Sequence, residues 1–366
     1  MKVGLITIYS VPNYGSVLQA FATQRIIEQF GHECVILKYD YHREQLRNKK
    51  RGFRGVLRDI LLDYWPSLKT SKLRRFRNQN YRFSKEFKSF KELQQYDWSS
   101  FDAFVVGSDQ VWNTKYLKGN PAFLLSFVPE GKRKISFSSS FALKKLPEEY
   151  VPLFRKELSR FVALSVREPN GVGIINNELQ IDKDVKVTLD PTLLLNGEQW
   201  KDLVKTPLNI IKPYILVYLW TYAFEPRPYF ERVVEHFQRK TGYDVRVLEG
   251  HRYLNDLNVP FIDNNHSSIS GYLDLFSKAS LVITSSFHGT AFAINFGIPL
   301  ISIVPNGNED DRQSGLLRTI GANNSIISIG APLEGINPYY DAVSVKSRLE
   351  YIRKDNLNWI KNTFNN

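Results

Sequence analysis

The chain has 366 residues, of which 43% are hydrophobic and 23% charged, so it is neither a single small module nor a disordered chain. At about 150 residues per domain, this length predicts two domains. The one cysteine, Cys34, excludes an internal disulfide and a zinc site built from a thiolate cluster, which fits a reducing compartment. No apolar run approaches the roughly 20 residues of a membrane-spanning helix, and residues 1–8 lack the features of a signal peptide, so we expect a cytoplasmic protein.

Positive charge is concentrated in one segment, residues 42–91, which we call the basic insertion. It holds 16 Lys or Arg against four Asp or Glu and thereby accounts for the whole formal net charge of +12. This distribution predicts a neutral globular protein with one basic segment, and no nucleic-acid partner. Apolar residues interrupt the basic runs, so the segment is either a solvated charged face or an amphipathic surface for an anionic leaflet or a phosphorylated lipid. These apolar residues are Leu57, Ile60, Leu61, Leu62, Tyr64, Trp65 and Leu68.

The first half of the chain alternates short strands with helices. Residues 3–9 predict a buried parallel strand that ends at Pro12, and Ser16 is the expected N-cap of a helix that Gly31 closes. Further strands are expected at residues 34–39, 103–107, 134–141, 164–167 and 185–189. This alternation predicts an α/β architecture around a parallel sheet.

A second α/β series follows a predicted boundary at Asp190-Pro191-Thr192. We expect strands at residues 214–220, 245–248, 281–284 and 300–304, helices at 228–241, 271–279 and 290–296, and a last helix at 343–364. The economical interpretation is two similar α/β halves in tandem.

Polar residues follow several of these strands, at the ends where open parallel sheets bind ligands. Asn13-Tyr14-Gly15-Ser16 follows the first strand, where a glycine lets the backbone approach a ligand and the helix start offers N–H groups to an anion or a sugar hydroxyl. Any β–α turn can use the same residues. Neither G-x-G-x-x-G nor G-x-x-x-x-G-K-[ST] occurs there, which counts against a nicotinamide or P-loop site.

A second polar segment, residues 107–113, contains Asp109, Gln110 and Trp112. A carboxylate, an amide and an aromatic ring are the groups that bind the hydroxyls and the apolar face of a hexose. The alternative is that Asp109 caps a helix and Trp112 fills the core.

A third strand end carries Arg167, whose guanidinium can bind a carboxylate or phosphate through two parallel hydrogen bonds. The alternative is a structural ion pair with Glu168 or Asp190.

The fourth segment, residues 284–290, joins a strand to a helix and contains His288. Of the six histidines, only this one is expected where a sheet end and a helix N-terminus meet, a geometry that offers an anion site and an imidazole able to move a proton. A buried structural histidine is the alternative. Because a helix N-terminus disfavours the protonated imidazole, a role as general acid requires a bound anion.

Metal ligation and cysteine catalysis have little support in the sequence. There is no H-E-x-x-H motif and no cysteine cluster, and the acidic run at residues 309–311 is typical of a solvated loop. Cys34 opens a strand of the buried type. We therefore expect no metal.

Five segments, in this order, resemble the polysaccharide pyruvyl transferase family: residues 13–20, 106–113, 165–168, 189–194 and 285–289. The resemblance spans roughly residues 3–322. It implies two Rossmann-like α/β domains in a GT-B-like arrangement, with the active site in an interdomain cleft. Residues 1–192 would form the acceptor-side domain, residues 193–345 the phosphoenolpyruvate-side domain, and residues 346–366 a C-terminal helix.

The resemblance also implies an activity. The enzyme would move a pyruvate ketal from phosphoenolpyruvate to a sugar of a bacterial surface polysaccharide, such as a capsule or exopolysaccharide, or of its lipid-linked precursor, with no redox cofactor or metal. If the acceptor is an undecaprenyl-pyrophosphate-linked oligosaccharide, the basic insertion would hold the enzyme peripherally at the inner face of the membrane.

The resemblance assigns donor residues by position. Arg167 matches the family arginine that faces phosphoenolpyruvate, and His288 matches the active-site histidine. The family has an arginine two residues before this histidine, where this chain has Ser286. Anion binding would therefore depend on Ser285, Ser286 and helix N–H groups, with Arg312 as the candidate replacement cation.

The chemistry assigns the remaining roles. His288 would be the general acid, and Asp109 the base or the group that orients the acceptor. The expected acceptor contacts are Asn13, Tyr14, Gly15, Asp109, Gln110 and Trp112.

Two other functions stay open at this point. A GT-B glycosyltransferase with a nucleotide-sugar donor would use the same two-domain fold, because fold does not fix function. A non-catalytic protein that binds lipid or nucleic acid would depend on the basic insertion alone.

Overall fold

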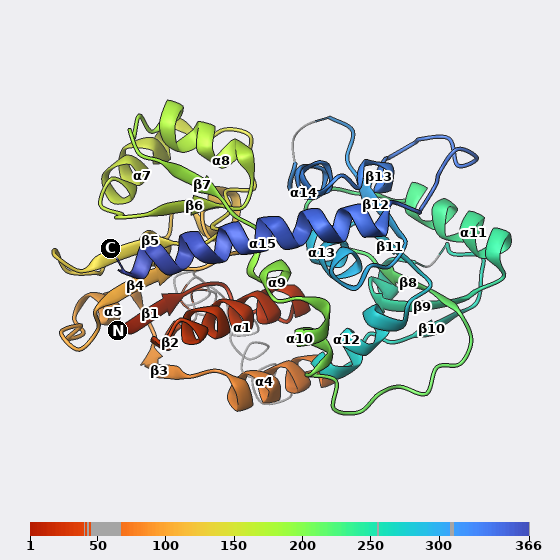
Figure 1. The fold of residues 1–366 in the computed structure, drawn as a ribbon, viewed down its shortest axis with the longest axis horizontal. Coiled ribbons are helices and arrows are strands. Elements are labelled where there is room, and N and C mark those ends of the chain that lie inside the picture. Colours follow the sequence, from red (N-terminus) through yellow and green to blue (C-terminus); the bar gives the residue numbers. More distant parts are fainter. Residues whose placement is uncertain (40, 42–43, 45–66, 255, 308–310, 366) are drawn as a thin grey trace, which may run out of the picture. The chain divides into compact units, whose positions relative to one another are not determined.

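The computed structural model describes residues 1–39, 41, 44, 67–254, 256–307 and 311–365, and divides the chain into two compact units (Figure 1). Unit 1 comprises Met1–Pro191 and Asn358–Asn366, and unit 2 comprises Thr192–Leu357. The division falls one residue before the expected boundary. The last helix, α15 (Ala342–Asn365), supplies residues to both units.

Unit 1 contains a five-stranded sheet in the order β3-β2-β1-β4-β5, with every neighbouring pair parallel. The central strands are continuous apolar runs because helices cover both faces of such a sheet. The strands are β1 (Lys2–Ile6), β2 (Glu33–Tyr39), β3 (Phe83–Phe87), β4 (Ala103–Val106) and β5 (Arg133–Ser136). A separate parallel pair is formed by β6 (Leu164–Val166) and β7 (Val185–Val187).

Short and long helices connect these strands. They are α1 (Tyr14–Gln29), α4 (Leu68–Asn80), α5 (Phe90–Gln94), α6 (Thr114–Leu117), η1 (Pro121–Leu124), η2 (Glu148–Tyr150), α7 (Val151–Leu158), α8 (Pro169–Gly173) and η3 (Ile174–Glu178).

Helix α1 begins earlier than expected, which corrects the assignment of Ser16 as its N-cap. Asn13 is the N-cap, and its side-chain oxygen accepts the Ser16 N–H at 3.3 Å. Asparagine caps a helix as well as serine does, which leaves the Ser16 hydroxyl available for another partner. That partner is Asp109, whose Oδ2 accepts the hydroxyl at 2.6 Å.

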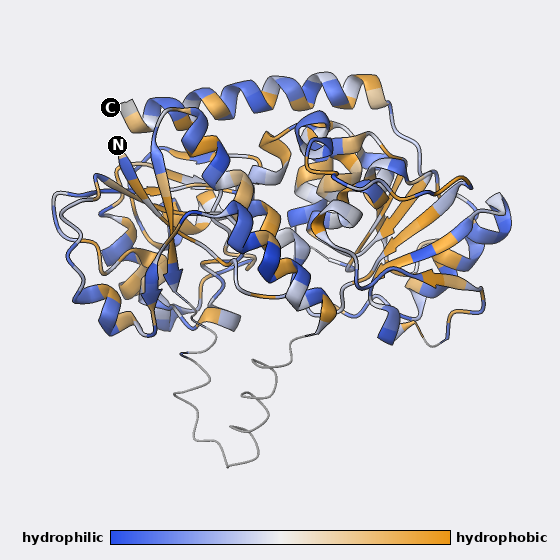
Figure 2. Cartoon of the chain, turned by 90° about the horizontal axis from the view of Figure 1, so that it is seen from below, coloured by the Kyte–Doolittle hydropathy of each residue, from blue (hydrophilic) through white to orange (hydrophobic). Residues whose placement is uncertain are grey.

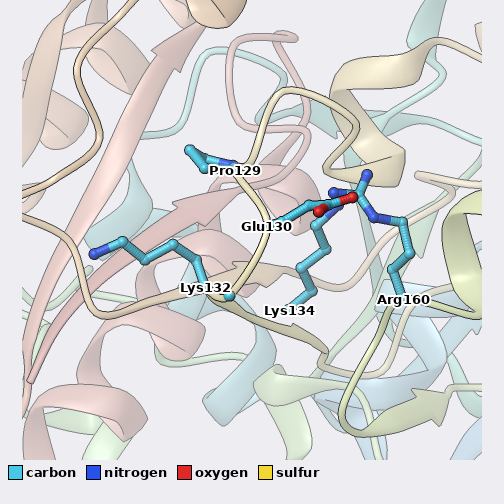
Figure 3. Close-up of a pocket in the computed structure, with 6 residues that line it drawn as sticks. Pro129, Glu130, Lys132, Lys134 and Arg160 are labelled. Carbon is cyan, nitrogen blue, oxygen red and sulfur yellow. The ribbon is translucent and has the colours of Figure 1, made fainter.

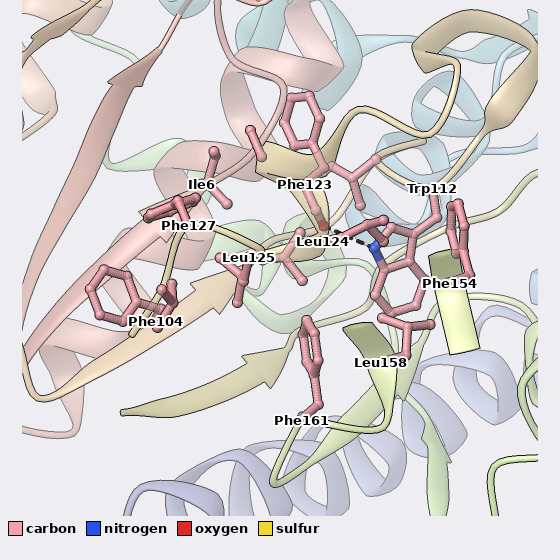
Figure 4. Close-up of a cluster of buried hydrophobic side chains, with 14 of the residues drawn as sticks. Ile6, Phe104, Trp112, Phe123, Leu124, Leu125, Phe127, Phe154, Leu158 and Phe161 are labelled. Carbon is pink, nitrogen blue, oxygen red and sulfur yellow. Dashed lines mark hydrogen bonds between the residues drawn. The ribbon is translucent and has the colours of Figure 1, made fainter. Parts of the chain in front are cut away.

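The core of unit 1 is rich in aromatic rings (Figure 4). Trp112 is 1% exposed, and its indole N–H donates to the carbonyl of Phe123 at 3.0 Å. The end of α15 packs on the same unit, because Arg133 Nη2 donates to the carbonyl of Thr363 at 2.7 Å and the ring of Phe364 lies 4.8 Å from that of His32.

Unit 2 contains a six-stranded parallel sheet in the order β10-β9-β8-β11-β12-β13. Its central strands are hydrophobic and buried along their whole length (Figure 2), as expected where helices cover both faces of a sheet. They are β8 (Tyr214–Tyr218), β9 (Asp244–Glu249), β10 (Phe261–Asp263), β11 (Leu281–Thr284), β12 (Leu300–Val304) and β13 (Ile326–Ser328). Two parallel sheets, each in its own α/β unit, confirm the predicted fold class.

The helices of unit 2 follow the predicted alternation. They are α9 (Pro191–Leu194, which starts at the division), α10 (Gly197–Lys201), α11 (Tyr229–Thr241), η4 (His251–Tyr253), α12 (Ile269–Lys278), α13 (Phe287–Phe296), α14 (Arg312–Ile320) and η5 (Asn323–Ser325). Helix α13 begins three residues before the expected start at residue 290, so His288 lies inside its first turn.

The basic insertion is described only in part. Residues 42–43 and 45–66, which hold most of the expected amphipathic stretch, lie outside the described residues. The described residues from 67 onward form α4, β3 and the start of α5. Helix α4 packs within unit 1: the Lys69 ammonium lies 4.7 Å from the centre of the Tyr14 ring, and Arg77 donates to the carbonyl of Tyr9 at 2.9 Å. In the described part of the chain, no helix combines the length and hydropathy needed to cross a membrane.

Candidate functional site

Seven buried polar residues of unit 1 follow the carboxyl ends of its strands, and we call them the polar cluster. Residues of β4, β5 and β6 are brought together there, because Asp109 forms a parallel bridge with Ser139, which in turn bridges to Val166. The sequence predicts this edge of the sheet as a ligand site. The polar cluster consists of Ser16, Ser108, Asp109, Ser140, Arg167, Glu168 and Asp190.

Asp109 has an unusual backbone conformation within the polar cluster. Its φ is +74°, in the left-handed region that costs most residues about 1–2 kcal/mol and that Asp and Asn tolerate best. Its carboxylate accepts the Ser16 hydroxyl at 2.6 Å and the N–H of Gln110 at 2.9 Å. The nearby helix α6 is capped instead by Asn113. Asp109 is therefore held in a strained, fixed position and is not a helix cap, which is typical of a functional residue.

Arg167 is buried between two carboxylates. Its Nη1 donates to Asp190 Oδ2 at 3.0 Å, and its Nε donates to Glu168 Oε1 at 3.3 Å. Each carboxylate also accepts a hydrogen bond from a serine hydroxyl: Ser108 donates to Asp190 Oδ2 at 2.8 Å, and Ser140 donates to Glu168. The ion pairs that the sequence offered as an alternative are thus present. Because two carboxylates face one guanidinium, this end of the polar cluster is not electropositive.

The expected acceptor contacts are distributed over three environments. Tyr14 is 0% exposed and Gly15 lies in the buried first turn of α1, whereas Asn13 caps that helix. Trp112 fills the core, so no face of its ring is open to a hexose, which favours the packing alternative. Gln110 lies beside Asp109 at the strand end and its Oε1 accepts from Asn113 at 2.8 Å. We therefore keep Asn13, Asp109 and Gln110 in the candidate site.

In unit 2, the turn from β11 to α13 is held tightly against β8. The Thr284 hydroxyl donates to the Tyr218 carbonyl at 2.7 Å and accepts the Ser286 N–H at 3.0 Å. The Ser285 hydroxyl donates to the carbonyl of Trp220 at 2.7 Å and accepts the N–H of the same residue at 2.9 Å. These two hydroxyls fix the turn, although the sequence suggested that Ser285 would bind an anion.

Gly289 allows the close approach of α13 to the sheet. A Cβ atom at this position would lie 2.3 Å from Thr284 Oγ1 and 2.8 Å from Tyr218 Cδ1. The Ser286 side chain caps α13 by accepting the Gly289 N–H at 3.4 Å. His288 is therefore placed on the first turn of a helix whose N-terminus faces the carboxyl end of the sheet.

His288 and Arg312 lie at the N-termini of two neighbouring helices. His288 is 7% exposed, and Arg312, the first residue of α14, is also 7% exposed. The next residue, Gln313, donates to Ser302 Oγ at 2.7 Å and to Thr290 Oγ1 at 3.4 Å, which holds the start of α14 against the first turn of α13. Two helix N-termini, an imidazole and a guanidinium in one region form a site suited to an anion.

Sequence analysis named Ser16 and Asp190 but did not predict the contacts that hold these groups in place. Ser16 and Asp109 are 93 residues apart, and Ser108 and Asp190 are 82 apart, so no local pattern connects them. The strand-end rule places such residues at the same edge of one sheet, but it does not say which of them form hydrogen bonds.

Solved structures share the fold at low sequence identity. A glycosyltransferase from Rickettsia africae ESF-5 is 12% identical, with a TM-score of 0.52 over 100% of this chain and 99% of that one. The Staphylococcus aureus protein MnaA, solved with UDP, is also 12% identical, with a TM-score of 0.52 over 97% and 96%. These likenesses establish the fold alone, which is α/β with two Rossmann-like units of the GT-B type. No curated protein sequence matches the chain.

A family model places the sequence more closely. The model described as polysaccharide pyruvyl transferase matches residues 13–307, a span that begins at the N-cap of α1 and includes Asp109, Arg167 and His288. This span covers most of the chain and all five segments that resemble the family. The protein therefore belongs to the polysaccharide pyruvyl transferase family.

Proposed function

We propose that this transferase takes the pyruvyl group of phosphoenolpyruvate and forms a ketal with two hydroxyls of one sugar, in a bacterial surface polysaccharide or its lipid-linked precursor. The observation that carries the proposal is the family match over residues 13–307, which includes Asp109 and Arg167 of unit 1 and His288 of unit 2 and ends before Arg312. The reaction uses two hydroxyl groups and one donor, and it releases one phosphate.

The chemical steps define what the protein must supply. A first sugar hydroxyl adds to C2 of phosphoenolpyruvate, the methylene carbon gains a proton to become a methyl group, and the hydroxyl proton goes to a base. The C2–O bond to phosphate then breaks through an oxocarbenium-like centre. A second hydroxyl attacks C2, loses its proton and closes the ketal. An acid, a base and an anion site for the donor are therefore required.

Unit 2 is proposed to bind the donor. The N-termini of α13 and α14 present N–H groups and positive dipole ends. Arg312 supplies a full positive charge, which Ser286 in place of the family arginine does not. His288 is the proposed acid for the methylene carbon. The bound anion would favour the protonated imidazole that this role requires.

Unit 1 is proposed to bind the acceptor. Asp109 is the base or the acceptor-orienting group, and Gln110 and Asn13 supply further polar atoms. Arg167 already forms ion pairs with Glu168 and Asp190, so we propose that it positions these two carboxylates. The anionic groups of the donor are then bound by unit 2. This assignment differs from the donor contact that the family resemblance implies for Arg167.

The direct test is a mass spectrum of candidate acceptor glycans incubated with the protein and phosphoenolpyruvate. We expect a pyruvate ketal adduct and release of one phosphate per adduct. A nucleotide-sugar glycosyltransferase would instead add a sugar. Thermal unfolding separates these activities independently, because a ligand at 100 times its Kd stabilises the native state by about 2.7 kcal/mol. Stabilisation by nucleotide sugars and not by phosphoenolpyruvate would overturn the proposal.

We extend the proposal to the acceptor's carrier. The basic insertion, with its interleaved apolar residues, would hold the protein on an anionic leaflet where a lipid-linked acceptor is presented. We expect binding to anionic vesicles that weakens steeply as salt rises. Equal binding to neutral vesicles would count against this extension.

A further inference from the structure

A small basic pocket lies at the start of β5, at the opposite end of this strand from the polar cluster. It has a volume of about 240 Å³ (Figure 3). The loop before β5 forms one side, and Arg160, which follows α7, forms the other. The residues that line it are Pro129, Glu130, Gly131, Lys132, Lys134 and Arg160.

Lys134 is the unusual residue of this pocket. It is 1% exposed, and its Nζ atom has no hydrogen-bond partner. The nearest acid, Glu157 on α7, lies 3.8 Å from Nζ, beyond hydrogen-bond distance. The same Glu157 oxygen accepts a closer bond of 2.9 Å from Arg160. A buried ammonium that makes no hydrogen bond, and that shares its ion-pair partner Glu157 with Arg160, is costly unless a further partner fills the pocket.

The charges around Lys134 sum to a positive site. Lys132, Lys134 and Arg160 contribute three cations against the two carboxylates of Glu130 and Glu157. Figure 3 shows the side chains of Lys134, Arg160 and Glu130 extending toward one another. Burial lowers the pKa of Lys134 to about 8, and Arg160 acts in the same direction, against the two carboxylates. An anion in the pocket would raise the pKa of Lys134 again, because its negative charge favours the protonated ammonium.

We propose that this pocket binds a phosphate-sized oxyanion, with inorganic phosphate as its simplest form. Lysine ammoniums and an arginine fork are the groups that bind phosphate oxygens. A volume of about 240 Å³ falls below the roughly 300–1,000 Å³ of pockets for drug-sized ligands, so the ligand is small. A protonated phosphate oxygen can donate to Glu130, which explains a carboxylate in a basic pocket. The inference is independent of the proposed pyruvyl transfer.

Phosphate can also bind at the proposed donor site, so the test must report on Lys134 itself. We would label the lysine side chains with ¹³C and ¹⁵N and follow the Nζ resonance that disappears in Lys134→Met. Inorganic phosphate should shift this resonance saturably and raise its titration midpoint, whereas chloride of the same ionic strength should not. A resonance that responds equally to both salts would overturn the proposal.

Matched variants extend the test to affinity, measured by calorimetry with inorganic phosphate. Arg160→Gln, which keeps Lys134, should weaken binding at this site about tenfold or more. The control is Lys183→Met, because the Lys183 ammonium already donates to the carbonyls of Ser159 and Phe161 and lines no part of the pocket. We expect this control to bind phosphate as the wild type does. Unchanged affinity in both Arg160→Gln and Lys134→Met would refute the site.

Discussion

The polar cluster of unit 1 and the site at the N-termini of α13 and α14 in unit 2 differ in the sign of their charge. In unit 1, a single guanidinium is enclosed by two carboxylates and several hydroxyls, so this site carries little positive charge. In unit 2, an imidazole and a guanidinium lie at two helix N-termini. A sugar needs directional hydrogen bonds and a base, whereas a phosphorylated carboxylate needs positive charge and an acid. The contrast fits the proposed binding of the acceptor by unit 1 and of the donor by unit 2.

The largest expected effect is on catalysis in unit 2. His288→Ala should lower phosphate release from phosphoenolpyruvate by about 10²–10⁴-fold, since a positioned general acid contributes that much. The matched control is His236→Ala, which changes a histidine on α11 of the same unit. We expect the control to keep its rate and both variants to unfold cooperatively. Unchanged phosphate release by His288→Ala would show that His288 is not the general acid.

The second effect is on the acceptor side. Asp109→Asn keeps a residue that tolerates φ +74° and an oxygen that can accept the Ser16 hydroxyl, but it removes the base. We expect kcat to fall by about 10²-fold or more while thermal stabilisation by phosphoenolpyruvate is retained. If donor binding falls instead and kcat is kept, the assignment of acceptor and donor to the two units is reversed.

The third effect is on stability. Arg167→Met leaves the carboxylates of Glu168 and Asp190 buried without their cation, which should cost about 3–5 kcal/mol of unfolding free energy in urea. Arg167→Lys should recover part of this loss, because it restores the positive charge but not the planar guanidinium that binds both carboxylates. A stable Arg167→Met protein with a strongly raised KM for phosphoenolpyruvate would instead show that Arg167 binds the donor.

The smallest effect is the contribution of Lys134, at the start of β5, to the pH dependence of the unfolding free energy. Burial lowers the pKa of Lys134 from 10.5 to about 8, so between these two values the unfolded chain binds a proton that the native protein lacks. Unfolding free energy should therefore rise with pH over this range, relative to Lys134→Met. Lys201→Met, at an exposed pair with Glu198, is the control and should follow the wild type.

Much of the fold could be predicted from the sequence because buried parallel strands are short apolar runs with breakers at both ends. The strands at residues 34–39, 281–284 and 300–304 are of this kind and lie where expected. β3 was missed, since its central residues Lys85 and Glu86 are exposed and charged on an edge strand. Helix starts were placed too late at Ser16 and Thr290, because several good capping residues stand in a row at each turn.

The site could be predicted only in its local parts. His288 was identified because a histidine in a strand–turn–helix segment is a local pattern, and the structure places it on the first turn of α13. The hydroxyls of Thr284 and Ser285 bind backbone at the end of β8 and just after it, about 65 residues away in the sequence. The burial of Trp112 likewise depends on packing against distant residues such as Phe141.

The return of the chain to unit 1 has a consequence for how the protein is made. Residues 358–366 complete unit 1, where Ile360 and Phe364 are 2% and 4% exposed. A fragment that stops at Pro191 would leave apolar surface beside β4 and β5 open to water and prone to aggregate. During translation, unit 1 can reach its final packing only after residues 358–366 have left the ribosome.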